Sequence, residues 1–290
     1  MIQWRKDSSK GAADFISIKI PVSLQVLLPK ELKTDHLVRI GNRRDGGYLI
    51  PSLVASDAKT LISFGLGADF SFEKEIAMLN PSIPITVYDH SVSLLISFMN
   101  LVSGITRGPK LRSRSEVRIR LSSIYHPAVF ILKYIIFFKI RANTKHIQKK
   151  VVKTVAKGRE ATIASIMSNC QSGALVKIDI EGSEYEILPT VFESAAKIVC
   201  LVVEIHDICA REAEFRRLLD RTLEHFALAH IHVNNASKVI DEIPDILELT
   251  FVAKQRVLSE QIDYDLPIIG LDFPNLIHEK DYKLDFSARN

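Results

Sequence analysis

The sequence predicts an α/β protein with a doubly wound, mostly parallel Rossmann-like sheet, and three observations support this fold class. Short apolar runs alternate with segments of helical periodicity from residue 60 onward, which is typical of βαβ units. A loop with two glycines separates the first of these runs from a helix-like segment. The chain has 290 residues, of which 47% are hydrophobic, so it is long enough to bury one large core.

The first half of this domain is predicted to alternate strands and helices up to a basic insertion. The runs that we expect to be strands are "TLISFG", "IPITVYD" and "EVRIRLSSI". The segments that we expect to be helices are "SFEKEIAMLN", "SVSLLISFMNLV" and, inside the insertion, "KHIQKKVVKTV". The third strand is inferred from the alternation of Val117, Ile119 and Leu121 with charged residues.

The alternation resumes after the insertion. We expect helices over "ATIASIMSN" and "AREAEFRRLLDRTLEHF", and strands over "ALVKIDI" and "KIVCLVVEIH". Two further β-like runs, "ALAHIHVNN" and "ILELTFVAK", lie close together without the long helix that a parallel crossover needs. They are therefore predicted to form an antiparallel C-terminal pair.

The chain is predicted to divide into three parts. Residues 1–55 form a preface that packs on the main domain, residues 56–255 form that domain, and residues 256–290 form a C-terminal extension. The insertion, at about 105–160, is basic: it contains 15 Lys and Arg against 2 Asp and Glu, whereas the net charge of the whole chain is only +4. The rest of the chain therefore carries a net charge of −9.

The insertion also contains the apolar segment "IYHPAVFILKYIIFFKI", residues 124–140, which includes Pro127 and Lys133. It falls short of the roughly 20 apolar residues that cross a bilayer. Two interpretations stay open: a buried helix, or peripheral contact with an anionic membrane. Nucleic acid is a less favoured partner, because the aromatic residues are not interleaved with Lys and Arg as base-stacking platforms would be.

The cysteines and the N-terminus predict a reducing compartment. Cys170, Cys200 and Cys209 are too few and too irregularly spaced for a disulfide framework or a CxxC metal site, and Cys200 is predicted to lie in the core. No apolar signal region follows the charged N-terminus. We therefore expect a cytoplasmic protein, with membrane association as the open alternative.

The glycine loop "SFGLGADFSFE" lies where a doubly wound sheet binds the anionic or ribose part of a ligand. Gly65 and Gly67 permit close approach of the backbone, and Ser71 is the expected N-cap of the following helix. A dinucleotide fingerprint needs a third glycine where this chain has Phe70, which argues against NAD. Asp89 ends the next strand, where it is placed either to accept ribose hydroxyls or to cap a helix.

The stretch "LVKIDIEGSEYEIL" ends a buried strand with four carboxylates. Ser183 and Glu186 match the S-x-x-E capping box, and Glu184 falls in the first helical turn, where a negative charge is favourable. Asp179 and Glu181 alternate with the apolar face of the strand, so they are expected to face the crevice at its carboxyl end.

The same strand leaves one structural interpretation open, since Lys177 could pair with Asp179 in a salt bridge. The next strand, "VVEIHD", ends with Glu204 and His206 on one face. Asp179, Glu204 and His206 are predicted to converge on a divalent metal such as Mg²⁺, or to act as a carboxylate and imidazole general-base site. A purely structural role for the histidine is the alternative.

These motifs resemble the FkbM-type methyltransferases, a family with the class I S-adenosylmethionine-dependent fold. The resemblance lies in "VKIDIEGSEYEIL" and "LVVEIHD", and in "RIGNRRDGGYLIP", "SFGLGADFSFE" and "VYDHS", and it spans residues 38–253 apart from the insertion. One departure is Ser63, where many class I enzymes carry an acid before the glycines. Asp69 or Glu73 would then have to take over its role.

The resemblance implies S-adenosylmethionine as cofactor, and together with the strand-end residues above it gives three sets of expected site residues. The expected cofactor-binding residues are Phe64, Gly65, Gly67, Asp69, Glu73, Asp89, Asp179 and Glu181. The expected substrate-cleft residues are Arg39, Asp45, Gly46, Gly47, Tyr48 and Asn234. The expected catalytic residues are Asp179, Glu204, His206 and His232.

The expected function is O-methylation of a hydroxyl on a sugar, glycan or natural product. Methyl transfer needs a nucleophile that has been relieved of its proton, which the acid and histidine pair would provide. The alternatives are an NAD-dependent sugar-modifying enzyme and a non-catalytic Rossmann-like domain associated with an anionic membrane. The sequence does not predict an oligomeric state.

Overall fold

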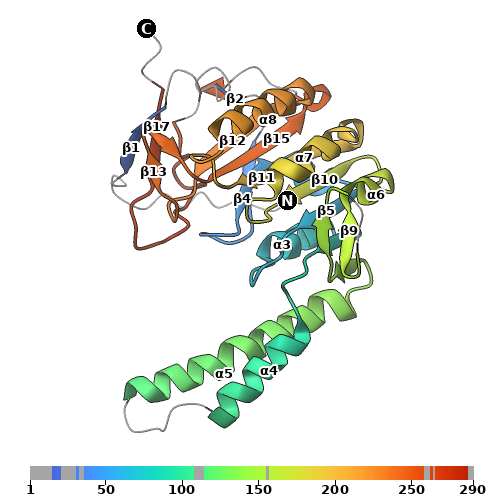
Figure 1. The fold of residues 1–290 in the computed structure, drawn as a ribbon, viewed down its shortest axis with the longest axis vertical. Helices are drawn as coiled ribbons and strands as arrows, with labels where there is room; N and C mark the ends of the chain where they lie inside the picture. Colours follow the sequence, from blue (N-terminus) through green and yellow to red (C-terminus); the bar gives the residue numbers. More distant parts are fainter. Residues whose placement is uncertain are drawn as a thin grey trace.

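The computed structural model describes residues 15–20, 31–32, 36–107, 114–154, 157–257, 262–263 and 265–286, and its centre is a seven-stranded sheet (Figure 1). The strands follow the order β12–β15–β11–β10–β5–β6–β7. All neighbours are parallel except β15, which is antiparallel to β11 and β12. The doubly wound fold class and its antiparallel C-terminal pair are thus confirmed. The strands are β5 (Thr60–Phe64), β6 (Ile85–Tyr88), β7 (Thr144–Ile147), β10 (Ala174–Ile178), β11 (Ile198–Ile205), β12 (Phe226–Val233) and β15 (Leu247–Ala253).

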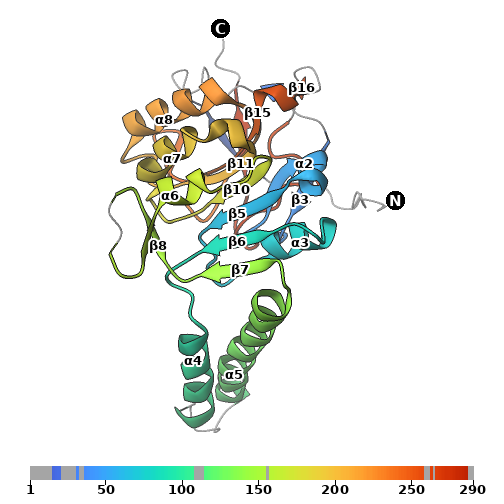
Figure 2. The same cartoon turned by 90° about the vertical axis from the view of Figure 1, so that its right-hand side faces the viewer.

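Helices cover both faces of the sheet (Figure 2). One face carries α6 (Ile163–Ser168), α7 (Glu184–Phe192) and α8 (Glu212–His225). The other carries α2 (Ser52–Asp57), α3 (Ser71–Leu79) and the hairpin of β3 (Leu37–Ile40) and β4 (Tyr48–Pro51). The central strands are apolar throughout because their side chains alternate between these two layers: Val176 and Leu201 pack in one cluster, Leu175 and Cys200 in the other.

The insertion differs from its prediction in two elements. The run "EVRIRLSSI" is not a strand but part of α5 (Arg114–Ile135), which pairs with α4 (Leu94–Arg107). The run "KHIQKKVVKTV" is not a helix, because β7 and β8 (Lys150–Val152) occupy it. β7 is the third parallel strand of the sheet and pairs with β6. This pairing is a tertiary contact, which the local periodicity of the sequence does not encode.

The α4–α5 hairpin projects beyond the β7 edge of the sheet (Figures 1 and 2). A π-helical turn, η1 (Ile136–Ile140), continues α5 toward β7. The stretch Leu121–Ile140 is long and apolar enough to cross a membrane by length and composition, and only 17% of its most apolar window is buried. The interpretation as a buried helix is therefore wrong for most of this segment, whereas Tyr134, Phe137 and Phe138 near its C-terminal end are buried in a core cluster.

The terminal segments meet beside the C-terminal strand pair. β1 (Ile16–Lys19) pairs in parallel with β17 (Tyr282–Asp285). The β3–β4 hairpin is tied to the sheet by Thr250 Oγ, which donates to the Leu49 carbonyl at 2.7 Å. The remaining short elements are β2 (Glu31–Leu32), β9 (Glu160–Thr162), η2 (Ala195–Lys197), β13 (Val239–Ile240), β14 (Ile243–Pro244), η3 (Lys254–Arg256) and β16 (Ile262–Asp263).

Candidate active site

A crevice of about 310 Å³ opens at the carboxyl ends of β5, β6 and β10. This is where parallel α/β sheets bind ligands. Its lining includes eight residues that the sequence analysis assigned to the cofactor or the substrate: Asp45, Gly46, Gly65, Gly67, Asp69, Asp89, Asp179 and Glu181. It also includes three lysines that the sequence analysis did not assign to a ligand: Lys149, Lys150 and Lys177.

The glycine loop needs its two glycines for different reasons. Gly65 has φ +83°, and a Cβ there would lie 1.7 Å from the backbone oxygen of Asp179. Gly67 has φ +55°, and a Cβ there would meet no atom within 4 Å. Gly65 therefore lets β5 and β10 close together, whereas Gly67 leaves the backbone accessible to a ligand in the crevice.

Asp89 supports this loop from the end of β6. Its Oδ2 accepts the backbone N–H groups of Leu66 at 2.7 Å and Gly67 at 3.1 Å, and its Oδ1 accepts that of Ser91 at 2.6 Å. Burial alone would raise the pKa of Asp89, but these hydrogen bonds outweigh it and hold the pKa below its usual value. The carboxylate thus faces the crevice while both its oxygens already bind protein donors.

Two of the expected cofactor residues lie in the interior. Phe64 is fully buried and stacks on Tyr88, with ring centroids 5.7 Å apart. Glu73 is fully buried as well and accepts a hydrogen bond from Ser63 Oγ at 2.6 Å. Neither lines the crevice, because Phe64 packs in the apolar core and the Glu73 carboxylate is buried against Ser63 and Lys177.

Asp69 is the acid of this loop that reaches the crevice. Its Oδ2 accepts Asn42 Nδ2 at 3.1 Å, which ties the loop to the β3–β4 turn, and its Oδ1 accepts the backbone N–H of Ser71 at 2.9 Å. The prediction of Ser71 as N-cap is wrong: Phe70 occupies that position and Ser71 begins α3. Asp69 instead accepts the N–H of Ser71, the first residue of the helix.

The β3–β4 turn is shaped by Arg39 and Gly47. The Arg39 guanidinium donates to the carbonyls of Asn42 at 2.7 Å and Arg44 at 2.9 Å. A Cβ on Gly47 would lie 1.9 Å from the Asn42 oxygen, so this position requires glycine. Arg39 and Gly47 hold the turn in place, and Asp45 and Gly46 present its tip to the crevice.

Tyr48, on β4, connects the β3–β4 hairpin to the buried acids beside the crevice, Asp179 and Glu204. Its hydroxyl lies 3.2 Å from Asp179 Oδ2 and 3.1 Å from Glu204 Oε2. Asn234 Nδ2 donates to the other Glu204 oxygen at 2.9 Å. Burial, together with the nearby carboxylates of Asp179 and Glu248, raises the pKa of Glu204 well above its usual value. One phenol hydrogen cannot serve both acids, and a proton on Glu204 removes that conflict.

Lys177 supplies the positive charge beside Asp179. Its Nζ lies 3.7 Å from Asp179 Oδ2 and 3.9 Å from Glu73 Oε1, and the side chain is buried. Burial alone would lower the pKa of Lys177, but the charges of Glu73 and Asp179 outweigh it and raise the pKa. The salt bridge that the sequence left open as an alternative is therefore present, within the crevice itself.

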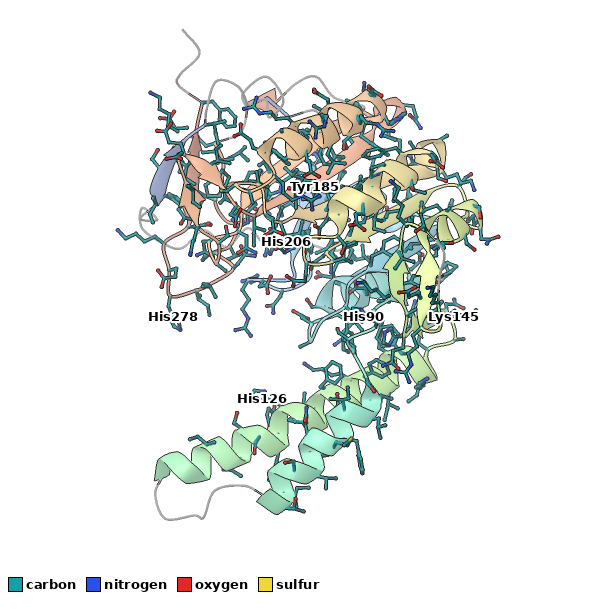
Figure 3. All side chains as sticks on the ribbon, viewed as in Figure 1. His90, His126, Lys145, Tyr185, His206 and His278 are labelled. Carbon is teal, nitrogen blue, oxygen red and sulfur yellow. The ribbon has the colours of Figure 1, made fainter. Side chains whose placement is uncertain are left out.

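His206 lies at the end of β11 among three acids (Figure 3). Its Nδ1 is 3.2 Å from Glu184 Oε1, and its Nε2 is 3.7 Å from Glu204 Oε1 and 3.5 Å from Glu181 Oε2. Burial by itself would lower the pKa of His206, but the bond to Glu184 and the neighbouring carboxylates raise it to about 9. The imidazole therefore carries a positive charge at neutral pH.

Glu184 has a larger role than the predicted one. It is fully buried, and its Oε1 accepts the backbone N–H groups of Ile180 at 3.1 Å and Gly182 at 3.2 Å as well as facing His206. Ser183 is the N-cap of α7, as predicted, but its side chain makes no capping hydrogen bond and Glu186 is exposed. The predicted capping box is thus absent: the N–H groups of Ser183 and Glu186 donate to the backbone carbonyls of Ile180 and Ser183 instead.

His232 belongs to a second buried cluster behind the crevice. Its Nδ1 lies 3.1 Å from Glu248 Oε2 and its Nε2 lies 3.2 Å from Asp281 Oδ2. Asn275 Nδ2 donates to Glu248 Oε1 at 2.6 Å. His232 lies outside the crevice lining, which does not support its predicted catalytic role. The polar Glu248 within the apolar run "ILELTFVAK" was the sequence signal for this cluster.

The predicted metal trio does not converge. Among the described residues, Asp179 and His206 group with Glu181, whereas Glu204 groups with Asp45 and Glu248, in each case with ligand atoms within 4.8 Å of one another. Lys177 Nζ lies 3.7 Å from Asp179 Oδ2, beside the first group. The predicted trio is therefore divided between two ligand groups, and a metal at this site stays a prediction.

Comparisons with known proteins add a similarity of fold. No protein-family model matches the chain, and no curated protein sequence matches it. Among solved structures, the chain is similar to a Methanococcus jannaschii fibrillarin pre-rRNA processing protein, with 9% identity, 70% of each chain covered and a TM-score of 0.37. It is also similar to a Geobacter metallireducens precorrin-6y C5,15-methyltransferase, with 11% identity, 70% of this chain and 87% of that chain covered and a TM-score of 0.35. Similarity at this level says nothing about the reaction.

Proposed function

We propose that the protein is an S-adenosylmethionine-dependent methyltransferase that acts on a hydroxyl oxygen of a small-molecule or glycan acceptor. The observation that carries this proposal is the crevice itself, where the open backbone at Gly67 lies beside the carboxylates of Asp69, Asp89, Asp179 and Glu181. The FkbM-type motifs "VKIDIEGSEYEIL" and "LVVEIHD" supply the acids and the histidine around it.

The residues of the crevice fit this cofactor. S-adenosylmethionine supplies, when bound, a methyl group on a positively charged sulfur. The acids of the crevice match a cationic ligand that also carries ribose hydroxyls, and the exposed Lys149 and Lys150 match its carboxylate. Gly67 would allow the ligand to contact the loop backbone.

The chain's own residues would orient the acceptor and take up its proton. Tyr48 and Lys177 hold Asp179 toward the crevice, and Asn234 holds Glu204 behind it. Burial raises the pKa of Glu204 and so favours its protonated form, and the pKa of His206 is raised to about 9, so His206 Nε2 becomes a proton acceptor as the pH approaches 9.

Titration calorimetry tests the proposal. We expect S-adenosylhomocysteine to bind the full chain and NAD not to bind, and we expect Asp179→Asn to weaken S-adenosylhomocysteine binding by about tenfold or more, since it removes a crevice charge. The matched control is Glu186→Gln on the exposed side of α7, which should leave the affinity unchanged. Binding of NAD without binding of S-adenosylhomocysteine would refute the proposed function.

A further inference from the structure

The α4–α5 hairpin exposes an apolar surface that the proposed reaction does not use. Of the 20 large apolar side chains exposed among the described residues, 13 lie between residues 94 and 140. Leu95, Phe98 and Met99 on α4 are 67%, 56% and 60% exposed. Residues 91–106 contain no charged residue. A monomeric surface rarely gathers apolar side chains in this way unless another apolar phase covers them.

The charge around this surface selects its partner. Residues 105–160 carry a net charge of +13, and Lys133 on α5 and Lys139 on η1 are exposed. A second copy of the chain would bring two such surfaces together at a cost in repulsion. An anionic lipid surface instead attracts them, with about fivefold tighter binding for each Lys or Arg near the headgroups.

A second cavity, of about 760 Å³, lies between the hairpin and the main domain. The hairpin contributes His126, Val129 and Phe130 to its lining, and Figure 3 shows His126 on α5 facing the main domain. Asp45 and Asp69 line both this cavity and the crevice, so the two spaces adjoin.

The lining of the second cavity is amphipathic. Phe70, Val129 and Phe130 form an apolar wall, and Lys74 and Lys133 lie on the same cavity. Neither lysine side chain forms an ion pair within the described part of the chain, and both are exposed. With Arg44, the lining carries three cations against the two carboxylates of Asp45 and Asp69. This combination matches a molecule with an apolar tail and an anionic head.

We propose that the hairpin seats the protein on an anionic membrane surface, and that the adjoining cavity receives an amphiphilic hydroxyl acceptor with an anionic head from that membrane. The acceptor half of this inference rests on the proposed methyltransferase function. The apolar face of α4 enters the interface, the basic residues bind the headgroups, and the acceptor head reaches the crevice past Asp45 and Asp69.

Vesicle flotation tests the membrane half. We expect the full chain to bind vesicles of phosphatidylcholine with phosphatidylglycerol at least about tenfold more tightly than pure phosphatidylcholine, and added salt to weaken this binding. The variant Leu95→Ser/Phe98→Ser/Met99→Ser should lose about tenfold or more. The matched control, Met78→Ser/Ile269→Ser/Ile277→Ser, changes equally exposed apolar residues elsewhere and should bind as wild type.

Two results would overturn the membrane half: equal binding to both kinds of vesicle, or unchanged binding by the α4 variant. A dimer in light scattering that the α4 variant dissociates, with no vesicle binding by wild type, would assign the face to a second copy instead. S-adenosylhomocysteine titration of wild type, beside its flotation, separates the two proposals. Cofactor binding by wild type without flotation refutes the inference alone, whereas flotation of wild type without cofactor binding refutes the proposed function.

Calorimetry with lysophosphatidylglycerol, below its micelle concentration, tests the cavity. Wild type should bind it more tightly than lysophosphatidylcholine, and Lys74→Ala/Lys133→Ala should reduce that affinity about tenfold, because both cations line the cavity. Lys145→Ala, an exposed lysine outside the cavity, is the control and should have no effect. Equal affinity for the two lipids, or an unchanged double variant, would exclude this cavity as the acceptor site.

Discussion

The polar centre of the crevice and the α4–α5 hairpin depart from the usual distribution of side chains in opposite directions. Around His206, ionisable groups such as Glu184, Glu204 and Lys177 are buried, and each of them has a hydrogen-bond or ion-pair partner. On the hairpin, large apolar side chains such as Leu95 face outward. Both arrangements cost folding free energy relative to an ordinary domain, so each marks a part of the molecule kept for binding or chemistry.

The comparison also separates two kinds of dependence. The buried charges depend on one another, so removing a single member leaves its partner uncompensated in a medium of low dielectric. The exposed apolar residues depend on a partner outside the chain, so in water alone each contributes little. Substitutions in the two regions should therefore differ sharply in their effect on stability.

The largest effect is expected from Glu184→Ala, which leaves the His206 imidazolium and two backbone N–H groups without their acceptor. Removing one member of a buried charge pair costs about 3–5 kcal/mol. Urea unfolding should show that loss. Glu186→Ala, two residues along the same helix and exposed, should change the free energy of unfolding by less than about 0.5 kcal/mol. Equal effects of the two substitutions would contradict a stabilising role for the buried contacts of Glu184.

A smaller effect is expected from pH. The pKa of His206 rises from 6.5 to about 9 on folding, so the imidazole binds a proton more tightly in the folded state than in the unfolded state. Its stabilisation is fully present below pH 6.5 and is lost as the pH rises through 9. Melting temperatures of wild type and His206→Gln should therefore converge between pH 7 and pH 10. A constant difference over that range would contradict the raised pKa.

The smallest effect is expected on the hairpin in the absence of lipid. Leu95→Ala changes a side chain that is 67% exposed, so it should alter the free energy of unfolding by less than about 0.5 kcal/mol. The same substitution at the buried Leu188 should cost about 2–5 kcal/mol, because it leaves a cavity in the core. A large loss at Leu95 would mean that another part of the chain covers the hairpin.

Much of the sheet was predictable because a buried strand and an amphipathic helix have different periodicities. The strands β5, β6, β10 and β11 and the helices between them follow that signal closely. The third strand was misplaced because a short alternation in α5 resembles a strand, while β7 is polar and lies at a sheet edge. Edge strands and exposed helices have weak patterns, so tertiary pairing decides them.

The candidate site was predictable to a similar degree. Chain position places Asp179, Glu181, Glu204 and His206 at strand ends, and the structure puts all four around the crevice or directly behind it. The roles of Phe64, Glu73, Ser71 and His232 were not predictable, because a motif gives the position of a residue and not the direction of its side chain. Tyr48 reaches Asp179 from 131 residues away in the sequence.

The sequence by itself determined the alternation of strands and helices, the two glycines of the loop, and the acids that end β10. Only the tertiary structure decided which acid faces which cation, why the pKa values of Glu204 and His206 are raised, and that an apolar helical pair projects into solvent. The physical reason is the distance along the chain between the groups that interact. Periodicity and turn chemistry are local properties of the chain, whereas protonation and exposure depend on groups that folding brings together from distant segments.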